Sequence, residues 1–224
     1  MKFASILLNE VPEDEEEEEL DLSALFGGSS PVPTYWPGMP AFYGPDNRAV
    51  LIAGEINEVV ANTVIAQMQQ LQTDNPDDPI RVYVNTVGGD AASGFALYDW
   101  MRCLSNPIIG ITYGRCSSAG LPILMGADYR LSTPRCRFFY HEVIGGMGVT
   151  STKELEEASK NYTWYQETMK SILMERCKKI NKTSWKKHFE GKTSFHFGPD
   201  FALEVGIIHD CLEEIKKKVT IPKE

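Results

Sequence analysis

The sequence predicts an α/β protein with a mostly parallel sheet, and three observations lead to this fold class. From residue 48 onward, short apolar runs rich in β-branched residues alternate with longer segments whose apolar residues recur at helical spacing. This alternation is typical of βαβ units, whose strands run parallel and are covered by helices. The hydrophobic fraction of 42% in 224 residues is enough for one sizeable core. We therefore expect a parallel βαβ core from which one long helix projects.

The first half of the expected domain holds two strand–helix units in succession. The expected elements are, in order, a strand at 49–54, a helix at 57–72, a strand at 80–85, a Gly-bearing loop at 87–90 and a helix at 91–104. The Asn/Asp/Pro cluster at 74–79 ends the first helix. Ligands of open α/β sheets bind beyond the carboxyl ends of the strands, which makes the Gly-bearing loop a candidate part of a site.

The second half is expected to continue the pattern and then to become helical. The expected elements are a strand at 107–113, a tight corner at 114–120, a buried helix at 121–127, strands at 128–134 and 136–141, a long helix at 152–177, shorter helices at 182–189 and 201–206, and a last strand at 207–209. Thr183 or Ser184 is the expected N-cap of the helix at 182–189. The long helix has more aromatic residues than one small core needs, so we expect it at a subunit interface, with core packing as the alternative.

The first 45 residues differ in composition from the rest. Residues 13–19 are seven consecutive acids, and runs rich in Gly, Ser and Pro follow them. Because like charges repel and little apolar surface offsets the ordering entropy, we expect a flexible arm at 1–45 and a folded domain at 46–224. The net charge of −9 argues against nucleic acid or an anionic membrane as the main partner.

The cysteines indicate a reducing environment. Their number is odd and none form a CxxC spacing, which argues against a disulfide framework and against a zinc site. These residues are Cys103, Cys116, Cys136, Cys177 and Cys211. No apolar run reaches the roughly 18 residues of a membrane span, and the N-terminal apolar run is too short for a secretory signal. We expect a cytoplasmic protein, or one in an equivalent reducing compartment.

A serine at a sharp corner and a histidine at the end of a strand are the candidate catalytic pair. Ser118 lies among small residues where a strand meets a helix, and such a corner can present a hydroxyl beside unpaired N–H groups. His141 ends the strand at 136–141 beside a second Gly-rich segment. A nucleophilic serine needs a base that is close in space and can be distant in sequence. Taken singly, small-residue packing and a structural histidine are the alternative interpretations.

Together these segments resemble the Clp-type serine peptidases, the ClpP-like proteolytic subunits, from about residue 48 to residue 215. Residues 84–89 stand where that family has an Asn-Ser-Pro-Gly-Gly loop, 114–120 match its nucleophile motif and 139–141 match its histidine strand. Further matches in the same order are 47–52, 66–68, 75–76, 97–101 and 202–208. The order and near-constant spacing of these segments make the resemblance specific.

The resemblance implies a fold, a reaction and a set of site residues. The fold is crotonase-like, with a superhelical βαβ core. Ser118 is implied as the nucleophile, His141 as the general base, and the backbone N–H groups of Gly89 and Ala119 as the oxyanion hole. The implied reaction is hydrolysis of peptide bonds in unfolded proteins or peptides, inside a homo-oligomeric ring of an ATP-dependent Clp complex. No cofactor and no metal are implied.

The sequence departs from this family at the third catalytic position. Counting back from Gly206 without gaps puts Ser194 where the family has an aspartate. A hydroxyl can accept a hydrogen bond from His141 but carries no charge, and losing that charge can cost about 10⁴ in rate. Glu142, Glu190 and Asp200 are acids outside the matching position that are candidates to compensate.

Other departures bear on partners and on activity. Val87 replaces the family's proline in the oxyanion loop, Glu142 and Val143 replace the Gln-Pro pair after the histidine, and the acidic arm does not match the axial N-terminal loop. Docking to an AAA+ unfoldase is therefore left open. We expect an active serine endopeptidase, and the first alternative is a weakly active or inactive structural subunit of a mixed ring. The second alternative is a crotonase-fold enzyme acting on acyl-CoA thioesters, for which the sequence places no carboxylate pair.

Overall fold

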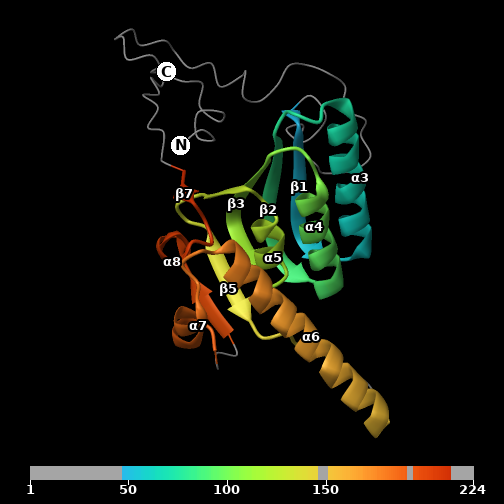
Figure 1. Ribbon diagram of the computed structural model, residues 1–224, viewed down its shortest axis with the longest axis vertical. Helices are drawn as coiled ribbons and strands as arrows, with labels where there is room; N and C mark the ends of the chain where they lie inside the picture. The colour runs from blue at the N-terminus through green and yellow to red at the C-terminus, as the bar shows by residue number, and fades with distance from the viewer. Residues whose placement is uncertain (1–46, 146–150, 191–193, 213–224) are drawn as a thin grey trace, which may run out of the picture. The chain divides into compact units, whose positions relative to one another are not determined.

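The computed structural model describes residues 47–145, 151–190 and 194–212, in which helices pack around one sheet (Figure 1). The expected arm at 1–45 lies outside these residues. Within them the strand order is β1-β2-β3-β4-β7, and β5 pairs with both β3 and β6. The pairs β2–β3, β3–β4, β3–β5 and β4–β7 are parallel, and β5–β6 is antiparallel. The expectation of an α/β fold with a mostly parallel sheet is confirmed.

The first half follows the expected order with longer strands. It comprises β1 (Ala49–Ile56), α3 (Glu58–Asp74), β2 (Ile80–Gly89), α4 (Ala91–Cys103) and β3 (Ile108–Ser117). Asn57 caps α3 by accepting from the Val60 N–H, and Asp90 caps α4 by accepting from the Ser93 N–H. The expected loop at 87–90 and the expected corner at 114–120 are shorter than predicted: β2 continues to Gly89, and β3 continues to Ser117 because residues 115–117 pair with β5, which leaves Ser118 and Ala119 as the corner.

The second half departs from the sequence prediction in three details. It comprises α5 (Gly120–Met125), β4 (Tyr129–Ser132), β5 (Arg137–His141), α6 (Thr152–Arg176), α7 (Lys182–His188), β6 (Ser194–Phe197), α8 (Pro199–Val205) and β7 (Asp210–Cys211). The N-cap of α7 is Asn181, not Thr183 or Ser184, because its side chain accepts from both of their N–H groups. The strand β6 was not predicted, and the last strand lies at 210–211 instead of 207–209. Gly206 ends α8 with φ +83°, as expected.

The core joins the sheet to the short helix that follows the serine corner. All six residues of α5 are buried, and this helix contacts β2 and β3 as well as α4 and α6. Packing of α5 on the sheet therefore fixes the position of the residues just before it. All five cysteines are free thiols. Among the described helices, none has the length and apolar character needed to cross a bilayer.

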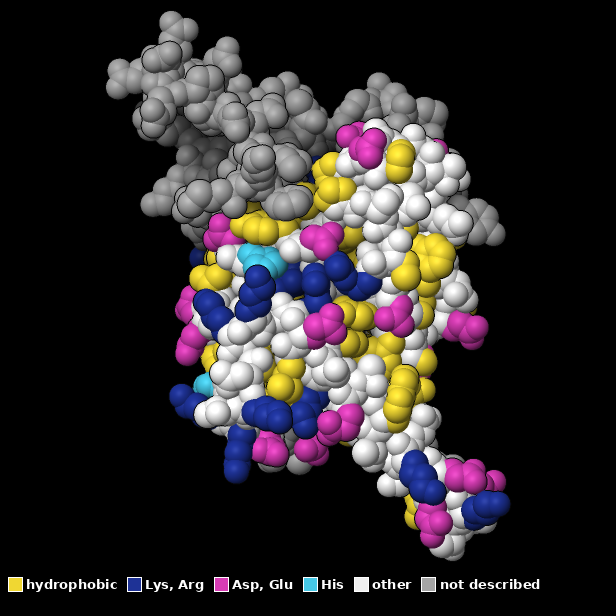
Figure 2. Space-filling model, viewed as in Figure 1, with side chains coloured by type: hydrophobic (Ala, Val, Ile, Leu, Met, Phe, Trp, Pro, Cys, Tyr) yellow, Lys and Arg dark blue, Asp and Glu magenta, His cyan; other side chains and the backbone are white. Residues whose placement is uncertain are grey.

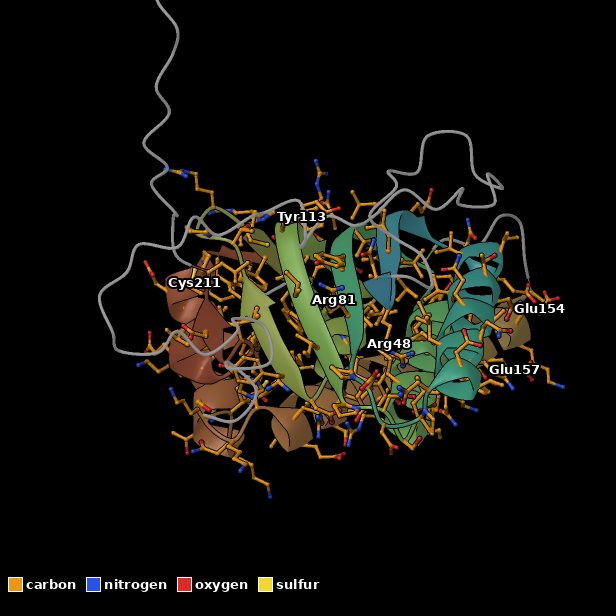
Figure 3. The ribbon with its side chains drawn as sticks, turned by 90° about the horizontal axis from the view of Figure 1, so that it is seen from above. Arg48, Arg81, Tyr113, Glu154, Glu157 and Cys211 are labelled. Carbon is orange, nitrogen blue, oxygen red and sulfur yellow. The ribbon has the colours of Figure 1, made fainter. Side chains whose placement is uncertain are left out.

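The long helix α6 extends away from the sheet (Figure 1). Its free end carries acidic and basic side chains together (Figure 2), and these include Glu154 and Glu157 (Figure 3). Large apolar side chains on this helix are exposed, with Leu155 at 57% and Trp164 at 58%. The expected subunit interface on α6 stays a prediction. In Figure 3, the label of Tyr113 marks β3 in the middle of the sheet. In the same view, α3 and the α7–α8 pair lie on opposite sides of the sheet.

Candidate active site

Ser118 lies at a strained corner between β3 and α5. Its φ of +54° is in the left-handed region, which costs a non-glycine residue roughly 1–2 kcal/mol. The Ser118 N–H donates to the Phe139 carbonyl on β5 at 2.8 Å, and the Ser118 carbonyl accepts from the Leu121 N–H at 2.9 Å. The residue is half-buried. A strained serine between a strand and a helix is the arrangement that exposes a nucleophilic hydroxyl in the α/β-hydrolases.

Two glycines at the end of β2 let that strand approach the serine corner. A Cβ on Gly88, which has φ +91°, would lie 2.5 Å from the Ser118 Cβ and 3.1 Å from the Ala119 N. A Cβ on Gly89 would overlap the Ile56 carbonyl oxygen. Only residues without a side chain fit at these two positions, so the backbone of β2 passes directly beside Ser118.

The two expected oxyanion donors are the residues that follow the two members of this contact, Gly89 after Gly88 and Ala119 after Ser118. Ala119 is buried at the N-cap of α5, and among the described residues its N–H makes no hydrogen bond. Gly89 is the last residue of β2. Thr86 holds the end of β2, because its Oγ1 accepts from the Gly88 N–H at 2.9 Å and donates to the Gly54 carbonyl.

His141 is the last residue of β5, the strand that accepts the hydrogen bond from Ser118. Its Nδ1 lies 2.6 Å from the Glu142 carbonyl oxygen. A carbonyl oxygen can only accept, so Nδ1 carries the proton and Nε2 is the basic nitrogen of the neutral ring. The ring also stacks on Phe139 at 5.2 Å. In the described part of the chain, no hydrogen bond joins the His141 ring to the Ser118 Oγ.

Ser194 lies directly opposite His141. The two residues are partners in the antiparallel β5–β6 pair, where directly opposed side chains are neighbours. Counting along the sequence therefore indicated the right neighbour. Within the described ranges, neither Ser194 nor the carboxylates of Glu142, Glu190 and Asp200 hydrogen-bond the His141 ring.

The sequence analysis missed Gln166 of α6, which holds the segment after His141. Its Oε1 accepts from the Val143 N–H at 2.8 Å, and its Nε2 donates to the Tyr140 hydroxyl at 2.6 Å. A polar residue between the apolar positions of α6 was the available signal, but the sequence does not give its partners. Beside this contact, Val143 and Tyr162 help to line a hollow of about 400 Å³.

Cys116 is a thiol two residues before Ser118. It is fully buried, and burial raises the pKa of its thiol well above the ordinary value. A buried, protonated thiol is unreactive, whereas the Ser118 side chain is only half-buried. A model of the Clp protease family matches residues 45–215 of the chain.

Proposed function

The chain belongs to the Clp protease family, and on this premise we propose that it is a serine endopeptidase with Ser118 as the nucleophile and His141 as the general base. Membership of the family implies peptidase activity. The observation that carries the finer proposal is the strained Ser118 corner, which is hydrogen-bonded to β5 two residues before His141. A residue held in a costly conformation by its surroundings is typical of an active site.

The chemistry follows from the groups at the three strand ends. The Ser118 Oγ attacks the carbonyl carbon of a peptide bond while its proton passes to His141 Nε2. The N–H groups of Gly89 and Ala119 stabilise the resulting oxyanion. His141 then gives the proton to the leaving amine, and water hydrolyses the acyl-enzyme by the same steps with His141 again acting as base. None of these reaction steps requires a cofactor.

We extend the proposal to the assembly and its substrates. The exposed apolar side chains of α6, Leu155 and Trp164, support self-association into a ring, since exposed apolar residues are typical of interfaces. Unfolded polypeptides are the proposed substrates, and docking to an AAA+ unfoldase is left to experiment.

A fluorophosphonate probe tests the catalytic pair. We expect the wild-type protein to be labelled at Ser118, and Ser118→Ala and His141→Ala to lose the label or to react far more slowly. Ser117→Ala is the matched control, because it removes the neighbouring serine hydroxyl and should keep the label. Absence of labelling in a correctly assembled wild-type protein would contradict the proposal.

One observation favours a second candidate function, that of a weakly active or inactive structural subunit in a mixed ring. The residue opposite His141 is Ser194, which provides no negative charge to stabilise a protonated imidazole. Assembly into a ring without labelling would support this candidate. Turnover of an acyl-CoA thioester without labelling would instead support a thioester-processing enzyme.

A further inference from the structure

We propose that Gln166 is a positioning residue for His141: it holds the peptide group between Glu142 and Val143 so that the Glu142 carbonyl keeps the proton on Nδ1. The proposal rests on the proposed function in that it gives His141 the role of base. It assigns to the backbone and to α6 the orienting task that a third catalytic side chain performs in other serine hydrolases.

The argument begins with the peptide group itself. The carbonyl of Glu142 and the N–H of Val143 belong to one planar unit, and the described chain has no cis peptide bond. In a trans unit the C=O and N–H point in opposite directions. The carbonyl oxygen lies 2.6 Å from His141 Nδ1, and the N–H donates to the Gln166 Oε1 at 2.8 Å. A single group therefore connects the imidazole with α6.

The Gln166 amide has only one orientation that satisfies both of its partners. The Val143 N–H can only donate, so Oε1 must face it, and Nε2 then donates to the Tyr140 hydroxyl at 2.6 Å. Tyr140 is 1% exposed, and its ring packs edge-on against Trp185 and Phe189. Burial raises the pKa of Tyr140 to about 12, so the phenol stays neutral at any pH suitable for an assay. The aromatic cluster around Tyr140 thus fixes the side-chain amide of Gln166. This amide in turn fixes the peptide group between Glu142 and Val143.

Hydrogen bonding at the N–H also strengthens the carbonyl as an acceptor, because hydrogen bonds in a chain polarise one another. The carbonyl then favours the tautomer with a proton on Nδ1 and a free lone pair on Nε2. Ser194, the residue opposite, makes no hydrogen bond to the ring in the described structure. Loss of Gln166 would therefore release both the ring orientation and the tautomer.

The decisive measurement is the tautomer of His141, read from ¹⁵N chemical shifts by solid-state NMR of the full chain at pH 8. The chain has four histidines, so ¹⁵N-histidine labelling gives few signals, and His141→Gln assigns the one of interest. We expect the wild type to carry the proton on Nδ1. Gln166→Leu, which removes the amide and so cannot accept from Val143, should give a mixture of tautomers. Gln166→Glu keeps an acceptor oxygen for Val143 and can accept from Tyr140, so it should retain the wild-type tautomer.

Labelling kinetics give the second readout. We expect Gln166→Leu to slow fluorophosphonate labelling of Ser118 about 10- to 100-fold, as losses of orienting residues do. Glu167→Leu is the matched control, because Glu167 is the next residue on α6 and pairs with Lys170 at the surface. It should change neither the tautomer nor the rate. Thermal unfolding of each variant shows that it is folded, and Tyr140→Phe replaces Gln166→Leu if the latter does not fold.

An unchanged Nδ1 proton in the folded Gln166→Leu protein, or in Tyr140→Phe where that replaces it, would overturn the inference even if labelling slowed. The tautomer is measured without any reaction at Ser118. Failure of wild-type labelling would therefore overturn the proposed function alone.

Discussion

Two histidines in this protein are held by backbone groups in opposite ways. The His141 Nδ1 donates to a carbonyl oxygen, whereas the His209 Nδ1 accepts from the Arg130 N–H at 2.9 Å. The first ring keeps its lone pair on Nε2, whereas the Nε2 of the second lies 3.1 Å from the Arg130 Nη2, so that both of its ring nitrogens face donors of one arginine. Among the described residues, no arginine is hydrogen-bonded to the His141 Nε2. The backbone partner, more than the residue type, separates a candidate catalytic histidine from a structural one.

The surroundings of His209 show what a structural site looks like in this fold. Arg130 is 2% exposed and donates to four backbone carbonyls, those of Ala127, Arg176, Gly206 and Ile207. These bonds join β4 to the ends of α6 and α8. Burial lowers the pKa of Arg130 to about 10, so its charge persists at neutral pH. The Arg130 side chain donates to all four of these carbonyls, whereas the Ser118 corner has a strained residue and an Ala119 N–H that makes no hydrogen bond within the described part of the chain.

The largest expected effect comes from restoring a charge opposite His141. Ser194→Asp places a carboxylate across the β5–β6 pair, where it can stabilise the protonated imidazole. We expect kcat/KM for a peptide substrate to rise about 10²- to 10⁴-fold, because loss of the equivalent charge costs about 10⁴. Ser194→Asn is the control of equal shape. Equal rates in the two variants would show that the missing charge does not limit the site.

A change in the other region should alter stability. Arg130→Met leaves the carbonyls that Arg130 binds without their donor, and each unsatisfied buried group costs about 1–3 kcal/mol. We expect the free energy of unfolding in urea to fall by at least about 3 kcal/mol. Arg102→Met removes a more exposed pair with Asp128 and should cost about 1 kcal/mol or less. Equal losses of unfolding free energy in Arg130→Met and Arg102→Met would show that the buried arginine stabilises the fold no more than the more exposed one.

The Ser118 corner should be sensitive to shape. Gly88→Ala adds a Cβ 2.5 Å from the Ser118 Cβ, at a φ of +91°. We expect it to slow labelling of Ser118 about 10²-fold and to cost about 1–3 kcal/mol of stability. Gly54→Ala is the matched control, because Gly54 also has a positive φ, +75°, but an added Cβ there would have no atom within 4 Å. It should cost about 1 kcal/mol through strain and leave labelling unchanged. Slower labelling in the control would mean that strain, rather than the contact, is responsible.

The smallest expected effect is a pH dependence of the unfolding free energy that His209 causes. Burial and the nearby Arg130 charge lower its pKa from 6.5 to about 4. The folded state thus favours the neutral His209 ring. The stability that this preference contributes is fully present above pH 6.5 and is lost as the pH falls towards 4. Because the residue is partly exposed, we expect about 1 kcal/mol, measured by urea unfolding at several pH values. His209→Gln should remove this part of the pH dependence, and an unaltered profile would argue against it.

Local patterns were enough to predict most of the fold. The alternation of strands and helices up to Ser117 depends on periodicity, which a single sequence shows directly. Strand ends were harder, since Gly88, Gly89 and Gly114 are typical of turns, yet β2 continues to Gly89, and β3 continues past Gly114 to pair with β5 at 115–117. The strand β6 was missed for the same reason, as it is four residues long and pairs only with β5 in the described structure.

The candidate site could be predicted in part. Spacing within a recognisable family indicated Ser118, His141 and Ser194, which the structure brings to neighbouring strand ends, although their roles stay predictions. Gln166 could not be found in this way. Its bond to Val143 joins residues 23 positions apart and depends on how α6 packs against β5. Residues that act through backbone groups leave no chemical signature in the sequence.

The Glu142 carbonyl has a consequence for how this site can change during evolution. Every amino acid at position 142 supplies a main-chain oxygen, so no point mutation there deletes it. A carboxylate side chain, in contrast, is removed by any substitution to a residue that lacks it, and position 194 carries a serine. If the main chain orients His141, substitutions of Glu142 are tolerated, and selection acts instead on Gln166 of α6.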